Sequence, residues 1–296
     1  MTPGLRPDVA GALQKAGLDP TEIERVVRRA LDEDLALGPD VTTISTVAED
    51  ASAVGDVVPR TPGVLAGVAV AAAVFDLVGG PAVELVLHAD DGSAREPGRA
   101  VLTVSGPTRA LLTAERTALN LVGHLSGIAS LTRTWADAVA GTGAAIRDTR
   151  KTTPGLRALE KYAVRCGGGV NHRMALGDAA LVKDNHVAAA GGITAAVEAV
   201  RAHAPEIPLE VECDTLDQVR EAIAAGVELV LLDNFSLKDT RTAVALARPA
   251  GVRLEASGGL TLDRAREVAE TGVDYLAVGA LTHSAPVLDL GFDLRD

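Results

Sequence analysis

The sequence predicts an α/β protein in which an incomplete parallel α/β barrel follows an N-terminal α+β sandwich domain. From residue 144 onward, short apolar strand-like runs alternate with amphipathic segments at intervals of roughly 20 to 35 residues, as in a parallel sheet with helical crossovers. Before that point, short β-like runs and helical patterns mix without this period. A complete eightfold barrel takes roughly 250 residues, so only six or seven strands fit.

The first 115 residues are expected to form the smaller domain. Two helical patterns cover residues 7–35, and Thr21 is the expected N-cap of the second because Glu24 follows three residues later. Residues 66–78 are predicted to form an apolar helix. The strand-like runs of this part are 54–58, 83–87 and 100–104.

A long helix is predicted over residues 107–140. Arg116, Asn120 and His124 recur every four residues and therefore share one stripe, which Gly127 extends. A polar stripe is most often a solvated face, but leucines beside this one leave it little surface. The pattern thus predicts a mostly buried Arg116, which would need an anionic partner because an unpaired buried charge is costly.

The predicted strands of the second part precede most of the chemically informative residues. They are 145–146, 179–182, 209–213, 229–232, 252–256 and 275–278. In parallel α/β folds, ligands bind at the carboxyl ends of strands. The residues just after these runs are therefore the candidates for a site.

A basic segment lies in an otherwise acidic chain. Residues 147–184 hold eight Lys and Arg against four Asp and Glu, whereas the whole chain has a net charge of −12. Nucleic-acid binding would need a basic face over a whole domain, so the segment better fits a pocket for a small, multiply anionic molecule. A solvated charged loop is the alternative.

The cations of this segment stand at strand ends. Arg150 and Lys151 follow the first predicted strand, and Lys183 follows the second. Three successive glycines precede His172 and Arg173, where they let the backbone approach a ligand closely.

Carboxylates close the next two strands. Glu210 and Glu212 alternate along one strand and so share a face, and Asp233 ends the following strand. Carboxylates grouped at a ligand face suit a hard cation, a sugar hydroxyl or a developing positive charge. Surface acids of an acidic protein are the alternative.

Glycine turns close the last two strands. Ser257, Gly258 and Gly259 follow one, and Gly279 and Ala280 follow the other. Backbone N–H groups at these two positions commonly hold a phosphate in barrels. We therefore expect a phosphate site there.

Other features exclude several classes of protein. No apolar run reaches the roughly 20 residues of a membrane span, and the N-terminus lacks a signal-peptide core, so a cytoplasmic protein is expected. Cys166 and Cys213 stand outside any Cys-x-x-Cys motif, which favours buried thiols over zinc or redox chemistry. The negative net charge disfavours nucleic acids and anionic membranes as partners.

At these residues the chain resembles quinolinate phosphoribosyltransferase. The matching segments run in family order from about residue 106 to about residue 284. They are GPTRALLTAERTALNLVGHLSGIAS, RDTRKTTPGLRALEKYAVRCGGGVNHRMALGDAALVKDNH, LEVECDTLDQVREA, LLDNFSL, EASGGL and GVDYLAVGALTHS. The N-terminal part matches more loosely, mainly through EDLALGPDVTT.

The resemblance implies a two-domain enzyme of NAD biosynthesis. It implies a sandwich domain of residues 1–115 joined by the C-terminal tail 285–296, and a barrel domain of residues 116–284. The implied reaction transfers the phosphoribosyl group of phosphoribosyl pyrophosphate (PRPP) to quinolinate with decarboxylation, giving nicotinate mononucleotide, pyrophosphate and CO₂. Mg²⁺ would be needed, but no organic cofactor. The enzyme would be a homodimer, or a higher oligomer, whose active sites the partner subunit completes.

Site roles also follow from the resemblance. The residues implied around quinolinate are Arg116 from the neighbouring subunit, Arg150, Lys151, His172, Arg173 and Lys183. The residues implied at PRPP and its 5′-phosphate are Glu212, Asp233, Ser257, Gly258, Gly259, Gly279 and Ala280. Mg²⁺ would lie near Glu212 and Asp233, held mostly through PRPP. The catalytic residues would be Lys151, Lys183, Glu212 and Asp233.

Three other functions fit parts of the pattern. A transferase for nicotinate or another monoacid would not release CO₂. Lys183 at a strand end could instead form a Schiff base in an aldolase-like barrel. A non-catalytic phosphoribosyl-binding module fits poorly with acids at the ribose position.

Overall fold

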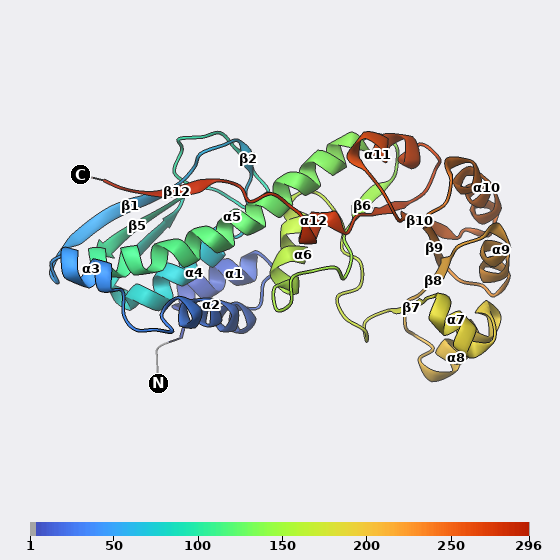
Figure 1. Cartoon of the computed structure of the whole chain (residues 1–296), viewed down its shortest axis with the longest axis horizontal. Coiled ribbons are helices and arrows are strands. Elements are labelled where there is room, and N and C mark those ends of the chain that lie inside the picture. Colours follow the sequence, from blue (N-terminus) through green and yellow to red (C-terminus); the bar gives the residue numbers. More distant parts are fainter. Residues whose placement is uncertain (1–3, 296) are drawn as a thin grey trace. The chain divides into compact units, whose positions relative to one another are not determined.

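The structure, a computed structural model, describes residues 4–295 and is shown in Figure 1. The chain forms two compact units. Unit 1 comprises Met1–Arg133, Thr153–Gly168 and Ser284–Asp296, and unit 2 comprises Thr134–Thr152 and Gly169–His283. No helix within residues 4–295 combines the length and the apolar character that crossing a bilayer requires.

Unit 1 contains an antiparallel four-stranded sheet with the order β12–β1–β5–β3. Its strands are β1 (Ser52–Pro59), β3 (Glu84–Leu87), β5 (Leu102–Pro107) and β12 (Leu290–Leu294). The first three confirm the predicted strand-like runs. β12 comes from the end of the chain and pairs with β1. A second sheet of two short strands, β2 (Gly63–Val64) and β4 (Ala94–Arg95), was not predicted, because two-residue strands carry no readable period.

Unit 1 also contains several helices. They are α1 (Pro7–Lys15), α2 (Pro20–Asp34), α3 (Val41–Thr46), α4 (Val68–Gly79), the 3-10 helix η1 (Gly80–Ala82), α6 (Arg157–Cys166) and most of α5 (Thr108–Ala138). Nearly all of α4 is buried, including Phe75, so this helix forms the centre of the core. The predicted apolar helix and the predicted long helix are both confirmed.

One local prediction in unit 1 is wrong. The N-cap of α2 is Asp19, not Thr21: the Asp19 carboxylate accepts the Thr21 N–H at 3.0 Å. Proline at position 20 occupies the first helical turn, where its missing N–H costs nothing. The short helix α3 was not predicted; Asp40 caps it by accepting the Thr43 N–H at 3.0 Å.

Unit 2 contains a six-stranded parallel sheet with the order β6–β11–β10–β9–β8–β7. Its strands are β6 (Ala145–Arg147), β7 (Ala180–Val182), β8 (Leu209–Cys213), β9 (Leu229–Asp233), β10 (Arg253–Ser257) and β11 (Tyr275–Ala277). All six predicted strands are confirmed to within one residue at each end. The first strand pairs with the last, but no pairing joins β6 to β7. Val170 forms an isolated parallel bridge to Arg147, so the incomplete barrel is open beyond it.

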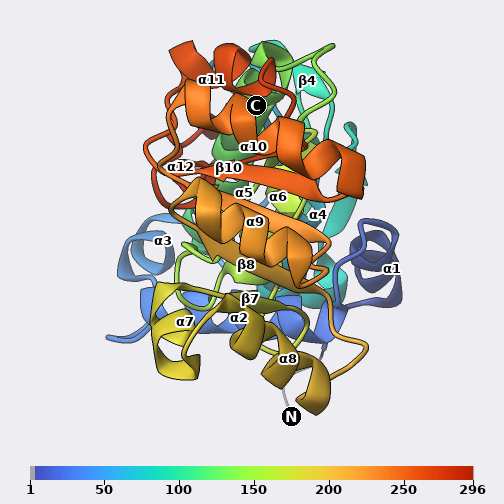
Figure 2. The ribbon, with the colours of Figure 1, turned by 90° about the vertical axis from the view of Figure 1, so that its right-hand side faces the viewer.

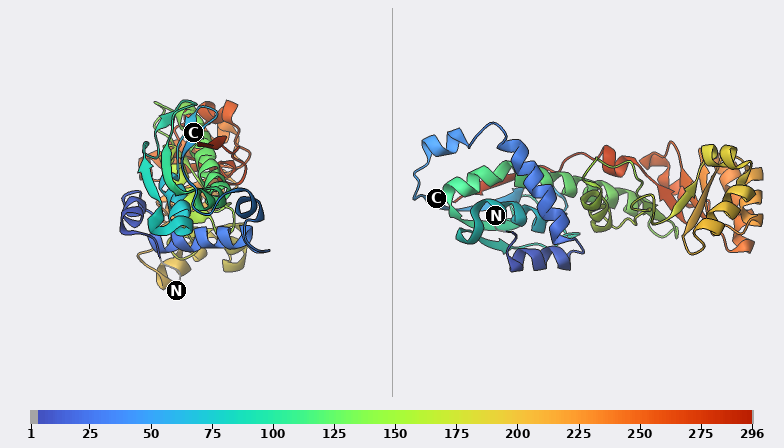
Figure 3. Two further views of the ribbon diagram at one scale, coloured as in Figure 1. Left: turned by 90° about the vertical axis from the view of Figure 1, so that its left-hand side faces the viewer. Right: turned by 90° about the horizontal axis from the view of Figure 1, so that it is seen from below.

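Helices cover one face of this sheet. They include α7 (Asp184–Ala190), α8 (Ile193–His203), α9 (Leu216–Ala224), α10 (Leu237–Ala247), η2 (Arg248–Ala250), α11 (Leu262–Ala269) and α12 (Ala280–His283). Figure 2 shows α8, α9 and α10 in front of the strands, and Figure 3 (right) shows the yellow and orange helices on one side of them. Val211 and Cys213 are fully buried, whereas Glu210 and Glu212 alternate with them and therefore face the interior.

Candidate active site

Unit 2 carries every predicted site residue except Arg116. These residues lie at the carboxyl ends of the parallel strands or just after them. Residues 150–151 follow β6, residues 172–173 follow the Val170 bridge, and Lys183 follows β7. Glu212, Asp233 and Ser257 stand at or near the ends of β8, β9 and β10, and residues 279–280 follow β11. Segments far apart in sequence thus reach one edge of the sheet.

Arg116 lies on α5 within unit 1, where its predicted burial is wrong. Its side chain and that of Asn120 are exposed in the described chain, whereas His124 is half-buried and Gly127 is buried. The stripe exists as the periodicity indicated, but no other segment of the described chain covers its N-terminal part. His124 does have a partner, because its Nε2 lies 2.8 Å from Oε1 of the buried Glu160.

Arg150 and Arg173 form a pair of like charges in unit 2. Burial, and then the charge of Arg150, lower the pKa of Arg173 below its ordinary value. The Nε atoms of both side chains are buried and have no hydrogen-bond partner within residues 4–295. Nη1 of Arg173 donates to the carbonyl of Ala179 at 2.9 Å. Two repelling, desolvated cations with unused donors favour an anion between them, and carboxylates match guanidinium geometry.

Asp148 joins the two basic segments. This fully buried carboxylate accepts the Asn171 side-chain amide at 2.5 Å through one oxygen. Its other oxygen accepts the His172 backbone N–H at 2.8 Å. Because Arg150 follows Asp148 by two residues and Arg173 follows His172 directly, these hydrogen bonds tie the segment of Arg150 to the segment of Arg173.

Carboxylates and a lysine occupy the next part of the edge. Lys183 forms an ion pair with Glu212 on the adjacent strand. The Lys183 amine is therefore engaged with a carboxylate, whereas the Schiff-base alternative needs a free amine. Asp233 accepts the side-chain amide of Asn234 at 2.8 Å, which leaves carboxylate oxygens available to a ligand.

The glycine turn after β10 has a steric cause. Asn234 has a left-handed φ of 55°, and its backbone N–H donates to the Ser257 carbonyl at 2.9 Å. Its side chain then lies against Gly258, where a Cβ would overlap Oδ1 of Asn234. Gly258 itself has a φ of +89°. Both facts require glycine, so the backbone of this turn stays uncovered and can approach a phosphate.

The turn after β11 meets the basic segment. A Cβ at Gly279 would lie 2.9 Å from Cδ of Lys151. The Lys151 carbonyl also accepts the Thr282 hydroxyl at 2.8 Å. Lys151 therefore packs along the glycine turn, with its exposed side chain beside the expected phosphate site.

Beneath this edge lies a buried cluster of His172, Glu210, Glu255 and Arg147. Ligand atoms of the first three lie within 4.8 Å of one another, and they form the single group of metal-ligand type within the described residues. Arg147 Nη1 lies 2.6 Å from Glu255 Oε2. Since this guanidinium already supplies a positive charge, we interpret the cluster as an internal network of paired ionisable side chains rather than a metal site.

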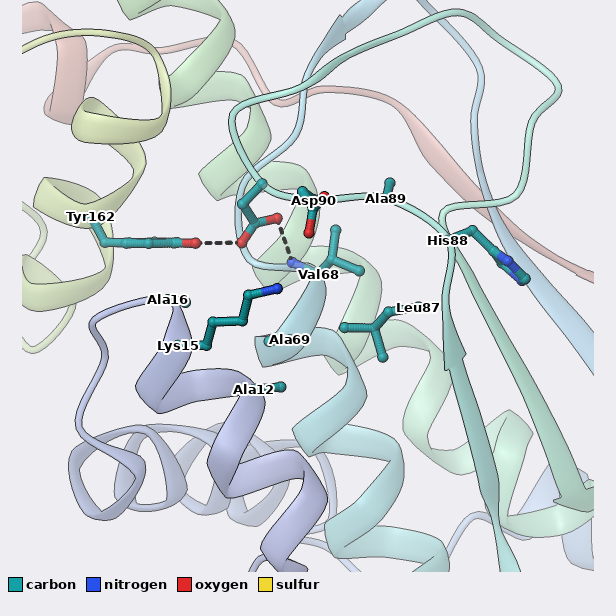
Figure 4. A pocket seen from close by; sticks show the side chains of 11 residues that line it. Ala12, Lys15, Ala16, Val68, Ala69, Leu87, His88, Ala89, Asp90 and Tyr162 are labelled. Carbon is teal, nitrogen blue, oxygen red and sulfur yellow. Dashed lines mark hydrogen bonds between the residues drawn. The ribbon is translucent and has the colours of Figure 1, made fainter.

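Unit 1 contains a separate cavity of about 530 Å³, shown in Figure 4. Lys15, His88 and Tyr162 are among the residues that line it. The carboxylate of Asp91 accepts the backbone N–H groups of Gly67 and Val68 at the start of α4 and the Tyr162 hydroxyl at 2.6 Å. This carboxylate therefore caps a helix, and no predicted site residue lines the cavity.

Comparisons with known proteins decide the family. Residues 40–126 match the domain described as Quinolinate phosphoribosyl transferase, N-terminal domain, and residues 128–293 match the C-terminal domain of that name. The chain belongs to the quinolinate phosphoribosyltransferase family. This confirms the predicted family, fold class and enzyme class, and with them the decarboxylating transfer of a phosphoribosyl group to quinolinate.

Individual relatives match this chain along nearly its whole length. Over 271 residues it is 58% identical to nicotinate-nucleotide pyrophosphorylase (carboxylating) of Mycobacterium leprae, a match that covers 90% of this chain and 95% of that protein. It is 41% identical to the probable Bacillus subtilis enzyme of the same name, covering 92% and 93%. The solved Francisella tularensis nicotinate-nucleotide pyrophosphorylase superposes with a TM-score of 0.89 at 37% identity, covering 93% and 96%.

Three residues that the structure places beside the candidate site were not predicted from the sequence. Asp148, Asn234 and Glu255 stand beside predicted site residues but received no role. Glu255 carried a readable signal, because it is an acid inside an apolar strand at a position that faces the interior. Nothing in the sequence marked the pairing of Asn234 with Gly258, since it depends on backbone angles.

Proposed function

We propose that the chain joins PRPP to quinolinate and releases CO₂ at the carboxyl edge of the parallel sheet of unit 2. The observation that carries this proposal is the arginine pair, in which two buried Nε donors face no partner within the described residues. Quinolinate has two adjacent carboxylates, and guanidinium groups bind carboxylates at two points. A dianion would remove the repulsion between Arg150 and Arg173.

We assign the two substrates to separate groups of residues. Quinolinate is assigned to Arg150, Lys151, His172, Arg173 and Lys183, with Arg116 supplied by a partner subunit. PRPP is assigned to Glu212, Asp233, Ser257, Gly258, Gly259, Gly279 and Ala280. The exposure of Arg116 in the single chain supports its insertion into another subunit, because an exposed cation is available to a neighbour.

Mg²⁺ fits the acidic part of the site. Glu212 and Asp233 offer hard carboxylate oxygens, the ligand type that Mg²⁺ prefers, and PRPP would supply most of the remaining ligands. When bound, Mg²⁺ would neutralise charge on the leaving pyrophosphate. Glu212 and Asp233 themselves would stabilise the positive charge that develops on the ribose as pyrophosphate departs.

The proposed reaction has two steps. The quinolinate nitrogen forms a bond to the ribose carbon as the bond from that carbon to pyrophosphate breaks, and the pyrophosphate leaves with the electron pair. The nitrogen is now cationic, so the bond to the neighbouring carboxylate can break and leave its electrons on the ring carbon. A proton from water then replaces the lost CO₂. The ring supplies its own electron sink, which is why we propose no organic cofactor.

Lysines at the site have distinct proposed tasks. Lys151, beside the glycine turn, would face the phosphates and accept charge on the leaving group. Lys183, which is paired with Glu212 on the neighbouring strand, would contact both substrates and orient them. We further propose a cytoplasmic homodimer that binds neither nucleic acid nor membrane.

One assay tests the proposed function. Quinolinate labelled with ¹⁴C in the carboxylate next to the ring nitrogen is incubated with the protein, PRPP and Mg²⁺, and nucleotide and CO₂ are followed together. The two products should appear in a one-to-one ratio and only when PRPP is present. Nucleotide without CO₂ would support the monoacid alternative, and an adduct trapped on Lys183 by borohydride would support the aldolase-like one.

A further inference from the structure

The interior of the parallel sheet holds ionisable side chains where barrels are ordinarily apolar. Branched apolar side chains usually fill this space. Here Glu255 is fully buried, and Glu210 and His172 are only 4% and 8% exposed. Burying such groups costs several kcal/mol unless each finds a partner. A protein that keeps a buried charged cluster under its substrate edge is expected to use it.

The cluster is an ordered series of contacts. Nη1 of Arg147 lies 2.6 Å from Oε2 of Glu255 and 3.9 Å from Oε2 of Glu210. That same Glu210 oxygen lies 2.9 Å from Nε2 of His172. Glu210 therefore stands between the guanidinium and the imidazole, and Glu255 holds the guanidinium in place.

The other side of the His172 ring fixes its tautomer. Nδ1 accepts the backbone N–H of Arg173 at 2.7 Å, so it carries no proton. The ring proton must then be on Nε2, where Glu210 accepts it. The carboxylate of Glu210 thus acts through the imidazole on the backbone of Arg173.

We propose that Glu210 is a positioning residue for the diacid pocket. Through His172 it holds Arg173 in the orientation that receives a substrate carboxylate, and Arg147 with Glu255 holds Glu210 in turn. This inference rests on the proposed role of Arg173 in binding quinolinate. Because both ring nitrogens of His172 are engaged, by the Arg173 N–H and by Glu210, His172 serves the quinolinate site by linking these two residues rather than by a ring hydrogen bond to the substrate.

The interior position of Glu210 makes the expected effect specific. The phosphate turns follow β10 and β11, whereas Glu210 itself lies on β8 and contacts His172, in the segment after the Val170 bridge. Loss of the Glu210 carboxylate should therefore weaken binding of quinolinate and leave binding of PRPP nearly unchanged. A merely structural role would affect both substrates.

Steady-state kinetics of two matched variants test this. Glu210→Gln keeps an oxygen that can accept from Nε2, and Glu210→Leu removes the acceptor at similar volume. We expect Glu210→Leu to raise KM for quinolinate by about tenfold, as a lost hydrogen bond to a charged group does, with KM for PRPP changed less than about threefold. Glu210→Gln should stay within about threefold of the parent for both. Glu198→Leu, at an exposed glutamate of α8, is the control.

The outcomes separate this inference from the proposed function. A parent enzyme without quinolinate turnover would overturn both. An active parent with an unchanged KM for quinolinate in Glu210→Leu, or equal changes in both KM values, would overturn the positioning role alone. One equivalent of bound transition metal, lost in Glu210→Leu, would also overturn it, because the cluster would then be a metal site.

A measurement on the unaltered protein covers the case in which Glu210→Leu does not fold. The chain has six histidines, so ¹⁵N-labelled imidazole signals can be assigned by comparison with His172→Gln. His172 should show a protonated Nε2 and an unprotonated Nδ1. The opposite tautomer would contradict the proposal.

Discussion

Arg150 and Arg173 lie close enough that the charge of one lowers the pKa of the other. Each also keeps a buried Nε without a partner in the described part of the chain. Such an arrangement is unfavourable in isolation, because burial and the charge of Arg150 both oppose the charge of Arg173, and the charges of Asp178 and Glu210 offset this only in part. It becomes favourable when an anion with two carboxylates enters. The proposed assignment of a diacid, rather than a monoacid, to this edge of unit 2 rests on this pair.

Replacing Arg173 should impair the use of quinolinate. A hydrogen bond to a charged group contributes about 1.5 to 3 kcal/mol, so Arg173→Ala should lower kcat/KM for quinolinate by roughly 10- to 150-fold. Arg241→Ala, at an exposed arginine of α10, is the control and should behave as the parent. Kinetics of Arg173→Ala equal to those of the control would remove Arg173 from the binding site.

Arg116 should act in another subunit. Both Arg116→Ala and Lys183→Ala should be nearly inactive by themselves, because each lacks a cation of the diacid pocket. Mixed under conditions of subunit exchange, they should regain activity, since one of the two sites in a hybrid dimer receives both intact residues. Exchange is checked by mass spectrometry of the hybrid. No recovery in proven hybrids would place Arg116 at the site of its own chain.

The glycine turn after β10 should be intolerant of a methyl group. Gly258→Ala adds a Cβ that overlaps Asn234 and also strains a positive φ, so KM for PRPP should rise and the midpoint of thermal unfolding should fall. Gly141→Ala is a matched control, because its φ is +80° and a Cβ there meets nothing within 4 Å. Equal effects of the two substitutions would show that strain alone, and not the contact with Asn234, is responsible.

Asp148 should stabilise unit 2 as well as its site. Asp148→Ala leaves the buried N–H of His172 without this acceptor, a loss of about 1 to 3 kcal/mol in the free energy of unfolding. Urea unfolding measures it. Asp137→Ala, at an exposed carboxylate of α5, should change the unfolding free energy by less than about 0.5 kcal/mol. A change for Asp148→Ala no larger than this would contradict the joining role.

Glu255 should make the stability depend on pH. Burial first, and then the charge of Glu210, raise the pKa of Glu255 from 4.5 to about 8. The charge of Asp148 raises this pKa further, and Arg147 lowers it. His172 also faces Glu255, with Nε2 at 3.8 Å from Oε1. Between pH 4.5 and pH 8, the carboxyl group of Glu255 has lost its proton in the unfolded chain but keeps it in the folded protein. The contribution of Glu255 to stability therefore falls as pH rises, by at most about 1.4 kcal/mol per unit, and levels off above pH 8.

The comparison variant for this pH effect is Glu255→Gln, which resembles the protonated acid. As the pH rises from 5 to 8, the urea midpoint of the parent should fall relative to that of Glu255→Gln. A difference that stays constant over this range would mean that Glu255 titrates outside it.

Much of the fold could be predicted from the sequence because its elements carry strong periods. The strands of unit 2 are apolar runs bounded by turns, and each was predicted to within one residue. β12 and the pair of β2 with β4 were not predicted, since their pairing depends on distant segments rather than on local pattern. The N-cap of α2 was misplaced because Asp19 and Thr21 are both good caps, and Pro20 decides between them.

In the candidate site too, features that follow from local pattern could be predicted, and features that depend on distant segments could not. Positions such as Lys183 and Asp233 could be predicted because strand ends meet at one edge of a parallel sheet. The burial of Arg116 was misjudged, because a face flanked by leucines in sequence can still lack a covering segment within its own chain. Arg147, Glu210 and Glu255 lie on β6, β8 and β10, which do not follow one another in the sequence. Only the folded sheet brings their side chains into contact.

The most direct test of the arginine pair compares the affinities of quinolinate and nicotinate by calorimetry, in the parent and in Arg173→Ala. The two ligands differ by one carboxylate. The parent should bind quinolinate at least about tenfold more tightly, and Arg173→Ala should lose most of that preference, since it lacks half of the pair. Equal affinities in the parent, or an undiminished preference in Arg173→Ala, would contradict the assignment of the pair to the diacid.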